Sequence, residues 1–439
     1  MKKPVEVVIL GAGNRSCLYA KYAAEHPGRM KIVAVAEPDP VRRAQCAATY
    51  SIAPENVVST WEDLASRPKF ADAVMNGTMD RMHYESTVPF LRKGYHVLLE
   101  KPIAPTEEEV RGLIAEAKSA GVTVMICHVL RYAPLYRKIR EIVTSGRIGN
   151  ILSLHSAEDV SYHHMAAAFV RGKWNRREIN PIMLAKCCHD LDLIAWMFSG
   201  IAPVRVSSFG SNSLFRPEMA PPGAPMRCLD GCPAEATCPY SAVPNYADSD
   251  MWTQYAFEDL EGIENPTREQ KIESLRSVSP LGRCVYHCGC DVADHQSMIV
   301  EFENGATASH DLFSNVPMTN RTMHIVGTLG DIHGDLTLGE ITLRTLDPSL
   351  PGNKFYIEEK IPSGVEGDMH GGGDFRLVED FINALRGEPT SSGATRIEDS
   401  LAGHLIAFAA DKSMLERRVV EIESRNRKVT YPETSFLVA

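Results

Sequence analysis

The 439-residue sequence has no run of about 18 consecutive apolar residues, the length that a membrane-spanning helix needs. Basic residues are not in excess either. Lys and Arg number 46 against 56 Asp and Glu, a net charge of −10, so no positive surface for nucleic acid or an anionic membrane is expected. Residues 1–4, Met-Lys-Lys-Pro, lead directly into a strand-like segment rather than an apolar leader. We therefore expect a cytoplasmic protein with no nucleic-acid and no membrane partner.

Internal repeats, low-complexity tracts and long linkers are also absent, and the apolar share of 44% is typical of a folded protein. Residues 1–127 alternate short β-branched runs with helical patterns, which predicts a doubly wound parallel sheet covered by helices. The strands are expected at 5–10, 31–36, 73–76, 95–99 and 123–127. Thr106, three residues before Glu109, predicts the start of a helix that ends near Gly121.

Residues 128–439 have a different pattern, with longer strand-like runs that are not separated by a helix at each step. Strands at 151–156, 297–302, 306–310 and 323–326, with helices near 182–198 and 375–385, predict an α+β domain with a large, mostly antiparallel sheet. Within this domain, about 215–291 is rich in Pro, Gly, Cys and charge. We interpret that segment as an irregular insertion.

A glycine-rich turn, Gly11-Ala12-Gly13-Asn14-Arg15-Ser16, follows the first strand and leads into a helix. Such a turn brings backbone N–H groups close to a pyrophosphate. Glu37 ends the second strand, 21 residues after Ser16, where a carboxylate accepts bonds from a ribose 2′-hydroxyl and repels a 2′-phosphate. The pair predicts NAD rather than NADP, although Arg42 and Arg43 are close enough in sequence to accommodate a phosphate.

The segment Leu98-Leu99-Glu100-Lys101-Pro102 ends a parallel strand, where open α/β sheets bind ligands. With this segment and the turn at Gly11, the chain resembles the Gfo/Idh/MocA family of NAD(P)-dependent oxidoreductases, which act mostly on sugars, inositols and related polyols. Further motifs that carry the resemblance are His83, Arg131-Tyr132-Ala133-Pro134, Gly146-Arg147-Ile148-Gly149, a helix with His189, and Gly371-Gly372-Gly373-Asp374. The resemblance implies an N-terminal Rossmann domain and a homodimer or homotetramer.

By this resemblance, Lys101 lies between nicotinamide and substrate, where it would stabilise the developing alkoxide, especially if burial lowers its pKa. His189 would take the hydroxyl proton together with an aspartate one turn earlier. Ala185 stands in that aspartate's place, and Lys186 lies three residues before His189, on the same helical face. We therefore predict Lys101, His189 and Lys186 as catalytic residues of a cationic site suited to an anionic sugar.

The remaining predicted site residues fall into two groups. The cofactor contacts are Gly11, Gly13, Asn14, Arg15, Glu37, Thr78, His83, Glu100 and Lys101. The substrate contacts, which together suggest a polar sugar site, are His128, Arg131, Tyr132, His163, Arg171, Trp174, Asp190 and His370.

Three functions are compatible with these residues. The first is NAD-dependent oxidation of a sugar, sugar acid or polyol by hydride transfer to nicotinamide. The second is an NAD-dependent glycoside hydrolase, in which retained NAD oxidises a sugar carbon transiently, elimination and water addition follow, and the ketone is reduced again. The third is a non-catalytic NAD sensor, whose function would survive replacement of Lys101.

Eleven cysteines in a chain of this type indicate thiols or metal ligands rather than disulfides. Cys228, Cys232 and Cys238 lie in the insertion, and Cys284, Cys288 and Cys290 follow. A structural zinc held by Cys228, Cys232, Cys238 and Cys284, with Cys288 as a substitute, is the predicted metal site. An iron–sulfur cluster ranks below zinc, and reduced, buried thiols without metal are the simpler alternative.

Overall fold

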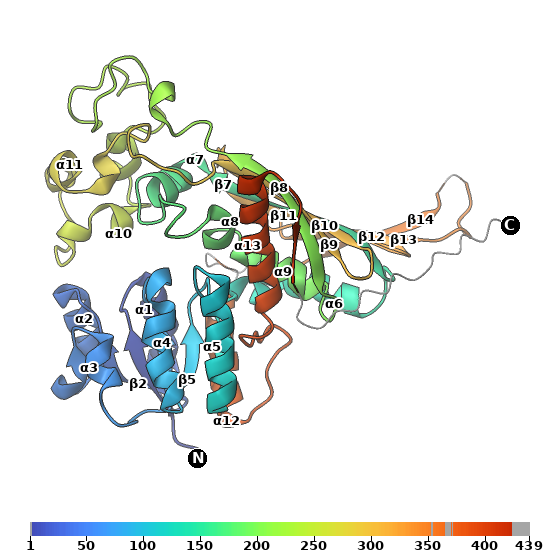
Figure 1. Ribbon diagram of the computed structural model, residues 1–439, viewed down its shortest axis with the longest axis horizontal. Helices are drawn as coiled ribbons and strands as arrows, with labels where there is room; N and C mark the ends of the chain where they lie inside the picture. Colours follow the sequence, from blue (N-terminus) through green and yellow to red (C-terminus); the bar gives the residue numbers. More distant parts are fainter. Residues whose placement is uncertain (1, 353, 365–369, 371, 424–439) are drawn as a thin grey trace.

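The computed structural model describes residues 2–352, 354–364, 370 and 372–423. The first domain is a parallel sheet of six strands in the order β3-β2-β1-β4-β5-β6 (Figure 1). The strands are β1 (Val5–Leu10), β2 (Met30–Ala36), β3 (Val57–Val58), β4 (Ala73–Asn76), β5 (His96–Leu99) and β6 (Val124–Ile126). The doubly wound sheet predicted from the sequence is confirmed.

Helices cover both faces of this sheet, because alternate residues of β1 are buried on opposite sides. Val7 and Ile9 pack toward α1 (Asn14–Glu25), whereas Val8 and Leu10 face α3 (Trp61–Ala65), α4 (His83–Arg92) and α5 (Glu107–Ala120). Helix α2 (Pro40–Tyr50) lies beside β2, with the Asp39 side chain accepting bonds from its first N–H groups. Thr106 caps α5 and Gly121 ends it, as predicted.

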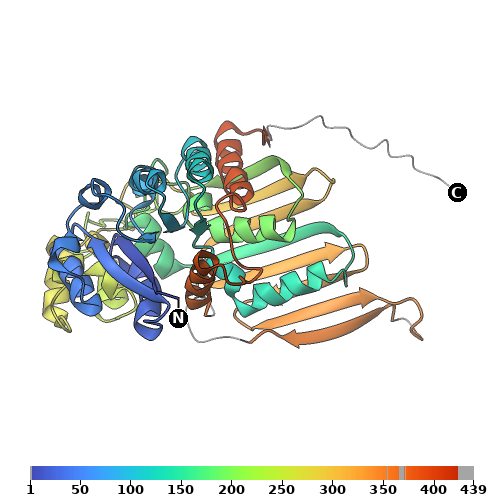
Figure 2. The same ribbon diagram turned by 90° about the horizontal axis from the view of Figure 1, so that it is seen from below.

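The second domain is a sheet of nine strands in the order β14-β13-β12-β11-β7-β10-β9-β8-β15 (Figure 2). The pair of β7 and β10 is parallel and the other pairs are antiparallel, which confirms a mostly antiparallel sheet. The strands are β7 (Ile151–Ser161), β8 (Pro203–Ser211), β9 (His295–Phe302), β10 (Thr307–Val316), β11 (Asn320–Gly327), β12 (Gly330–Asp335), β13 (Glu340–Leu346), β14 (Tyr356–Pro362) and β15 (Val420–Glu421).

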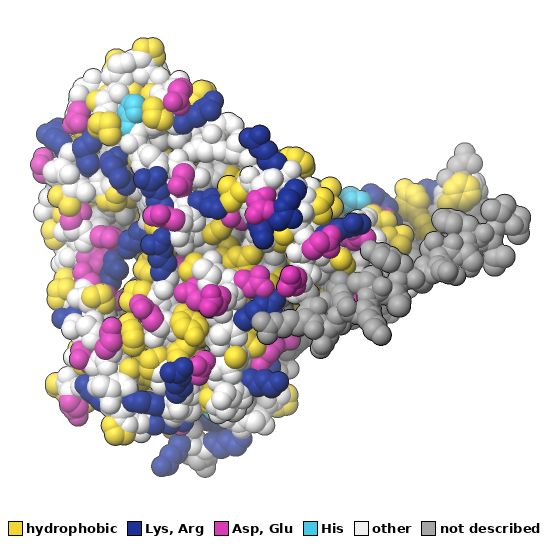
Figure 3. Space-filling model, in the orientation of Figure 1, with side chains coloured by type: hydrophobic (Ala, Val, Ile, Leu, Met, Phe, Trp, Pro, Cys, Tyr) yellow, Lys and Arg dark blue, Asp and Glu magenta, His cyan; other side chains and the backbone are white. Residues whose placement is uncertain are grey.

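One face of the large sheet is covered by α6 (Pro134–Thr144), α9 (Cys188–Met197) and α13 (Leu401–Glu416) (Figure 2). The other face leaves Phe209, Ile299 and Phe313 exposed. The predicted homodimer or homotetramer would use such a face, and the assembly stays a prediction. Figure 3 shows cationic and anionic side chains interspersed over one side of the molecule.

The predicted helix at 182–198 is in fact two helices. Helix α8 (Ile182–Ala185) stops before Lys186, and α9 starts at Cys188 in a new direction. Helix α13 was not expected from the sequence, because it is apolar around its whole circumference and has no amphipathic pattern. It is buried between α9 and β8.

A helix from the late part of the chain completes the core of the first domain. Helix α12 (Gly373–Arg386), which lies close to the predicted helix 375–385, packs Leu377 and Phe381 against the nucleotide-binding sheet rather than the large one. The predicted boundary at 127 falls between the two sheets, and α12, from beyond that boundary, packs into the core of the first domain. Among the described residues, no helix combines the length and apolarity that crossing a membrane requires.

The Cys-rich insertion contains only short helices, which include α10 (Thr253–Ala256) and α11 (Arg268–Ser277), in line with the predicted irregular segment. It lies above α2 in Figure 1. There Arg42 of α2 donates to Glu261 of the insertion at 2.7 Å and lies 3.7 Å from Glu258. The insertion thus contacts the first domain beside the end of β2.

The buried histidine of β10 makes the stability of this core depend on pH. His310 is fully buried, and burial lowers its pKa to about 4. The unfolded chain takes up this proton below about pH 6.5 and the folded chain does not, so the free energy of unfolding falls as the pH drops from 7 to 5. We expect His310→Asn to reduce the slope of the unfolding free energy against pH by up to about 1.4 kcal/mol per pH unit, as measured by urea titrations. Replacing the exposed His26 by Asn should leave this slope unchanged. An unchanged slope in His310→Asn would contradict the lowered pKa of His310.

Candidate active site

The turn after β1 has the geometry of a phosphate-binding loop. Gly11 has φ +77°, and a Cβ there would lie 2.8 Å from the carbonyl oxygen of Gly77 after β4, so the turn packs tightly on the neighbouring strand end. At Gly13 a Cβ would meet nothing within 4 Å, and no side chain caps the helix that starts at Asn14. The first N–H groups of α1 are thus open to an anion, which fits the pyrophosphate of a dinucleotide.

Glu37 joins this turn to the end of β2. Its carboxylate is 5% exposed and accepts bonds from the backbone N–H groups of Ala12 at 2.6 Å and Asp39 at 2.9 Å. Arg42 is held by Glu261, as described above, and Arg43 donates to the carbonyl oxygen of Pro38 at 3.0 Å. Both guanidinium groups therefore have partners, and a carboxylate at the end of the second strand, beside the glycine turn, is typical of NAD-binding sites.

Thr78 and His83 hold the loops around the predicted cofactor site. Thr78 donates its N–H and hydroxyl to the side chain of Asn76. His83 is fully buried, with Nδ1 2.8 Å from the carbonyl oxygen of Pro102 and Nε2 3.1 Å from that of Thr78. Both nitrogens of His83 are therefore engaged by the protein, and its placement is that of a positioning residue. The Lys101–Pro102 peptide bond is cis.

A buried charge network surrounds the end of β5. Arg15 lies 3.1 Å from Glu100, which also accepts from Tyr19 Oη at 2.6 Å, and Arg15 pairs with Asp374 of α12. Burial would raise the pKa of Glu100, but Arg15, Lys101 and Tyr19 together hold it below its ordinary value. Glu100 is consequently an anion, and it accepts the backbone N–H of Lys101 at 2.8 Å.

Lys101 is a cation in this setting. Burial works to lower its pKa, but Cys188, Glu100 and Asp80 raise it above the ordinary value, so the net shift is opposite to the effect of burial alone. Its Nζ lies 3.3 Å from the carbonyl oxygen of Ala185. Lys101 can therefore donate a hydrogen bond and place positive charge beside a substrate oxygen, and it is not a base.

His189 of α9 has the opposite character. It is 7% exposed, and among the described residues its Nδ1 has no hydrogen-bond partner. Burial, Lys101 and His128 hold its pKa well below the ordinary value, so the ring is neutral. The rings of His128 and His370 lie 5.9 and 6.2 Å away, and His370 Nδ1 is 3.0 Å from Asp374.

Lys186 does not share the helical face of His189, because the chain breaks between α8 and α9. Its Nζ lies 2.8 Å from Glu158, a fully buried carboxylate of β7 that also pairs with Arg321. Arg321 donates to Asp190 at 2.9 Å as well. The two cations, Lys186 and Arg321, are balanced by two anions. Glu158 and Asp190 are these anions, so the network around Lys186 has no net charge, in contrast to the cationic Lys/Lys/His site expected from the sequence. Glu158 and Arg321 were not found from the sequence, although Glu158 occupies an inward-facing position of its strand.

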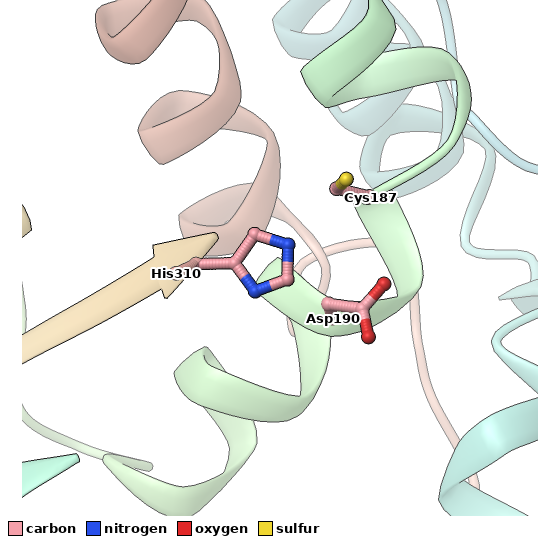
Figure 4. Close-up of side chains that lie close together, drawn as sticks. All are labelled: Cys187, Asp190 and His310. Atoms are coloured by element: carbon pink, nitrogen blue, oxygen red, sulfur yellow. The ribbon is translucent and has the colours of Figure 1, made fainter. Parts of the chain in front are cut away.

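Asp190 belongs to a second buried group, shown in Figure 4, with Cys187 and His310. The potential ligand atoms of the three lie within 4.8 Å of one another. His310 Nδ1 is 2.8 Å from Ser156 Oγ, and Asp190 already pairs with Arg321. Since the neighbouring charges balance without an added cation, this group fits the packed core between α9 and β10.

Several predicted substrate residues lie behind the site rather than in it. Arg131 makes two bonds of 2.7 Å to Asp192, and Tyr132 is buried in the core of the first domain. Arg171 lies apart from Lys101, among the cysteines of the insertion, where it donates to the carbonyl oxygens of Arg283 and Tyr240. Arg131 and Arg171 are therefore occupied by protein partners, and Tyr132 is enclosed in the core, with its hydroxyl unpartnered among the described residues.

An aromatic group is the better candidate for a sugar-contacting wall. Trp252 of the insertion donates from Nε1 to His163 at 3.1 Å, and its ring lies 5.1 Å from that of His164. Trp174 donates from Nε1 to Asp80 at 3.0 Å, which also accepts from Asn180 at 2.7 Å. Trp252 could not be found by sequence reasoning, because it lies in the insertion, far along the chain from His163.

The fold and the site define an oxidoreductase of the dinucleotide-binding class. Residues 5–128 match the family model described as an oxidoreductase family with an NAD-binding Rossmann fold, and residues 136–241 match the GFO/IDH/MocA C-terminal domain. The chain belongs to the GFO/IDH/MocA family, which confirms the resemblance. Lys101, Glu100 and Asp374 of the family-like motifs are described in the structure, whereas Gly371 lies outside the described residues.

Relatives with assigned names cover different parts of the chain. Oxidoreductase YteT of Bacillus subtilis is 25% identical over 364 residues, 80% of this chain and 82% of its own. The 2,7-anhydro-N-acetylneuraminate hydratase of Escherichia coli is 26% identical over 209 residues, 46% of this chain, and the match spans 52% of the hydratase. Levoglucosan dehydrogenase in complex with NADH has the same fold, with a TM-score of 0.69, 17% identity, and coverage of 96% of this chain and 100% of its own.

The two glycines of the phosphate loop provide a matched pair of variants. Gly11→Ala should lower the free energy of unfolding by about 1–2 kcal/mol, because the new Cβ meets Gly77 and φ is positive. Gly13→Ala should leave stability unchanged and weaken NAD binding at least tenfold, because its Cβ points to the place of the pyrophosphate. Urea denaturation and calorimetric NAD titration measure both. Normal NAD affinity in Gly13→Ala would contradict the assigned phosphate site.

Proposed function

We propose that the protein is an NAD-dependent oxidoreductase that transfers a hydride between a carbinol carbon of a sugar, sugar acid or polyol and nicotinamide. One observation carries the proposal: Lys101 and His189 lie near each other beside the phosphate loop. Lys101 is a cation, whereas His189 is neutral and its Nδ1 has no hydrogen-bond partner among the described residues. Oxidation of an alcohol needs both groups, one to stabilise the oxygen that loses its proton and one to take that proton.

NAD, when bound, supplies the hydride acceptor. Lys101 donates a hydrogen bond from Nζ to the substrate oxygen and stabilises the alkoxide, while His189 accepts the hydroxyl proton. Glu100 fixes the backbone N–H of Lys101, and Arg15 keeps Glu100 ionised. The aromatic group of His163, His164, Trp174 and Trp252 would pack against the apolar face of a sugar ring.

The substrate class follows from the charge of the site and from the relatives. Glu158 neutralises Lys186, so a neutral sugar suits the site better than the anionic one expected from the sequence. Levoglucosan dehydrogenase and 1,5-anhydro-D-fructose reductase are both named for uncharged anhydro sugars. We therefore propose anhydro sugars as the first substrates to test.

A redox-neutral reaction with retained NAD is the second candidate. Arg42 on α2 is held by Glu261 and lies near Glu258, which also pairs with Lys173 at 2.7 Å, so the insertion is fastened over the edge of the nucleotide-binding domain. Such a contact would slow the release of a dinucleotide and favour a closed cycle of oxidation and reduction.

Substitutions of the two proposed catalytic residues test the proposal. Lys101→Met and His189→Asn should each lower kcat/KM by about 10²–10⁴-fold while NAD still binds. The matched control is Lys21→Met, on the exposed side of α1. Loss of activity only through loss of NAD binding, or full activity in either variant, would show that these residues do not act on the substrate.

The products separate the two candidates. With levoglucosan and related anhydro sugars, the dehydrogenase accumulates NADH, whereas the redox-neutral enzyme keeps its cofactor and incorporates solvent deuterium into the product at the carbon beside the transient ketone. Absorbance and mass spectrometry on the same reaction record both. Turnover with neither signature would exclude both candidates.

A further inference from the structure

The uncovered face of the large sheet carries two histidines and an aspartate side by side, which we call the His–Asp–His cluster. His324 of β11 stands directly opposite His333 of β12, and Asp331 lies two residues before His333 on the same strand. Side chains alternate between the two faces of a strand. Because Ile325 and Ile332 belong to the core under the helices, all three cluster residues point to the uncovered face.

The three side chains converge on one point. Nε2 of His324 lies 3.4 Å, and Nε2 of His333 lies 3.2 Å, from the same carboxylate oxygen, Oδ2 of Asp331. The potential ligand atoms of all three residues lie within 4.8 Å of one another. Bonds of about 2.0–2.1 Å to a tetrahedral ion place neighbouring ligand atoms about 3.4 Å apart. The two distances to Asp331 therefore match the spacing of ligands around a single ion.

The imidazole rings of the cluster can adjust to such an ion. The rings of His324 and His333 are stacked, with centroids 3.6 Å apart and planes 19° from parallel. A shared ion needs the rings tilted apart, so that each nitrogen lone pair points to it. The χ2 angle of histidine has a broad range, and the two side chains are 36% and 46% exposed, so solvent leaves room for the rotation. Side-chain motion alone thus gives a coordinating geometry.

The neighbouring charges leave the carboxylate of Asp331 available to a cation. Arg344 Nη1 lies 3.5 Å from Asp331 Oδ2, which is a long contact. The closer partner of this guanidinium is Glu358, which accepts from Arg344 Nε at 2.8 Å. Since Glu358 compensates most of the charge of Arg344, Asp331 keeps negative charge between the two histidines.

We propose that His324, Asp331 and His333 bind a divalent transition-metal ion of the zinc type. Two imidazoles and one carboxylate suit zinc, nickel or copper, whereas Mg²⁺ and Ca²⁺ prefer oxygen ligands. Three protein ligands leave a fourth position of a tetrahedral ion on the solvent side, where water can bind. The ion would join β11 to β12 and so clamp this hairpin of the sheet.

Two other sets of potential ligands differ from this cluster. Cys187, Asp190 and His310 also bring three ligand atoms within 4.8 Å, but they are buried beside charges that balance without an added cation. The four cysteines predicted from the sequence as zinc ligands line a small cavity. They belong to neither of the two groups found among the described residues, and zinc at these cysteines stays a prediction.

The proposed metal site is separate from the proposed active site. Helix α9, which carries His189, packs on the other face of the large sheet (Figure 2). The metal would therefore take no part in hydride transfer, and its assignment does not depend on the proposed function.

Calorimetric titration of the full, reduced chain with Zn²⁺ after removal of bound metal by a chelator tests the proposal. Because thiols also bind zinc, the comparison is between the wild type and the double variant His324→Ala/His333→Ala. We expect the wild type to bind one more Zn²⁺ per chain than the double variant. Each single variant should weaken that binding at least about tenfold, since one of three ligands is lost. Zn²⁺ should also raise the Tm of the wild type more than that of the double variant.

The matched control is His155→Ala. His155 of β7 stands opposite His324 on the other side, but its Nε2 is held by Asp311 at 2.9 Å, so this variant should bind Zn²⁺ like the wild type. Equal zinc binding by the wild type and the double variant would overturn the site. A loss in His155→Ala as large as that in His324→Ala would overturn the ligand set. Displacement of Zn²⁺ by an equal concentration of Mg²⁺ would overturn the class of metal.

A crystal soaked in zinc chloride gives a second measurement that needs no variant. Anomalous scattering at the zinc absorption edge should show a peak between the side chains of His324, Asp331 and His333. Zinc peaks at the cysteines alone would refute the proposal.

Discussion

The partly buried ion pairs of Arg15 hold together the segments that form the proposed active site. Its guanidinium, on the first turn of α1, reaches Glu100, 85 residues away, and Asp374, 359 residues away. Phosphate loop, end of β5 and helix α12 therefore share one charge network. Removal of Arg15 would leave the buried carboxylates of Glu100 and Asp374 without the cation that they share, which is destabilising. The place of Lys101, next to Glu100, depends directly on this network.

Charge balance also distinguishes the other buried polar groups of the protein. Near His189, Lys186 and Arg321 are matched by Glu158 and Asp190, and this balance keeps the surroundings of the substrate neutral. Arg171 has no such carboxylate and lies among thiols. The same electrostatic rule thus indicates a packed core near His189, whereas carbonyl and hydroxyl oxygens satisfy the guanidinium of Arg171.

Residues with local constraints could be predicted from the sequence. The phosphate loop, Glu37 and Glu100-Lys101 follow directly from strand ends, and the structure places them around one edge of the parallel sheet. The break before Cys188 could not be predicted, since Lys186 turns aside to reach Glu158 on a distant strand. Arg171 lies between His163 and Trp174 in sequence, yet its partners come from the insertion. Contacts of this kind depend on tertiary packing, which periodicity does not encode.

The central claim is that hydride transfer to NAD begins at the site of Lys101 and His189. A single-turnover experiment tests it most directly. Protein loaded with NAD is mixed rapidly with an anhydro sugar shown to bind, and the absorbance of reduced nicotinamide is followed. The account predicts a burst of NADH in the wild type, whether the reaction is a net oxidation or a closed redox cycle in which the ketone intermediate accumulates, and no burst in Lys101→Met. Conversion of the sugar without any reduced nicotinamide, in the wild type and at every mixing time, would contradict it.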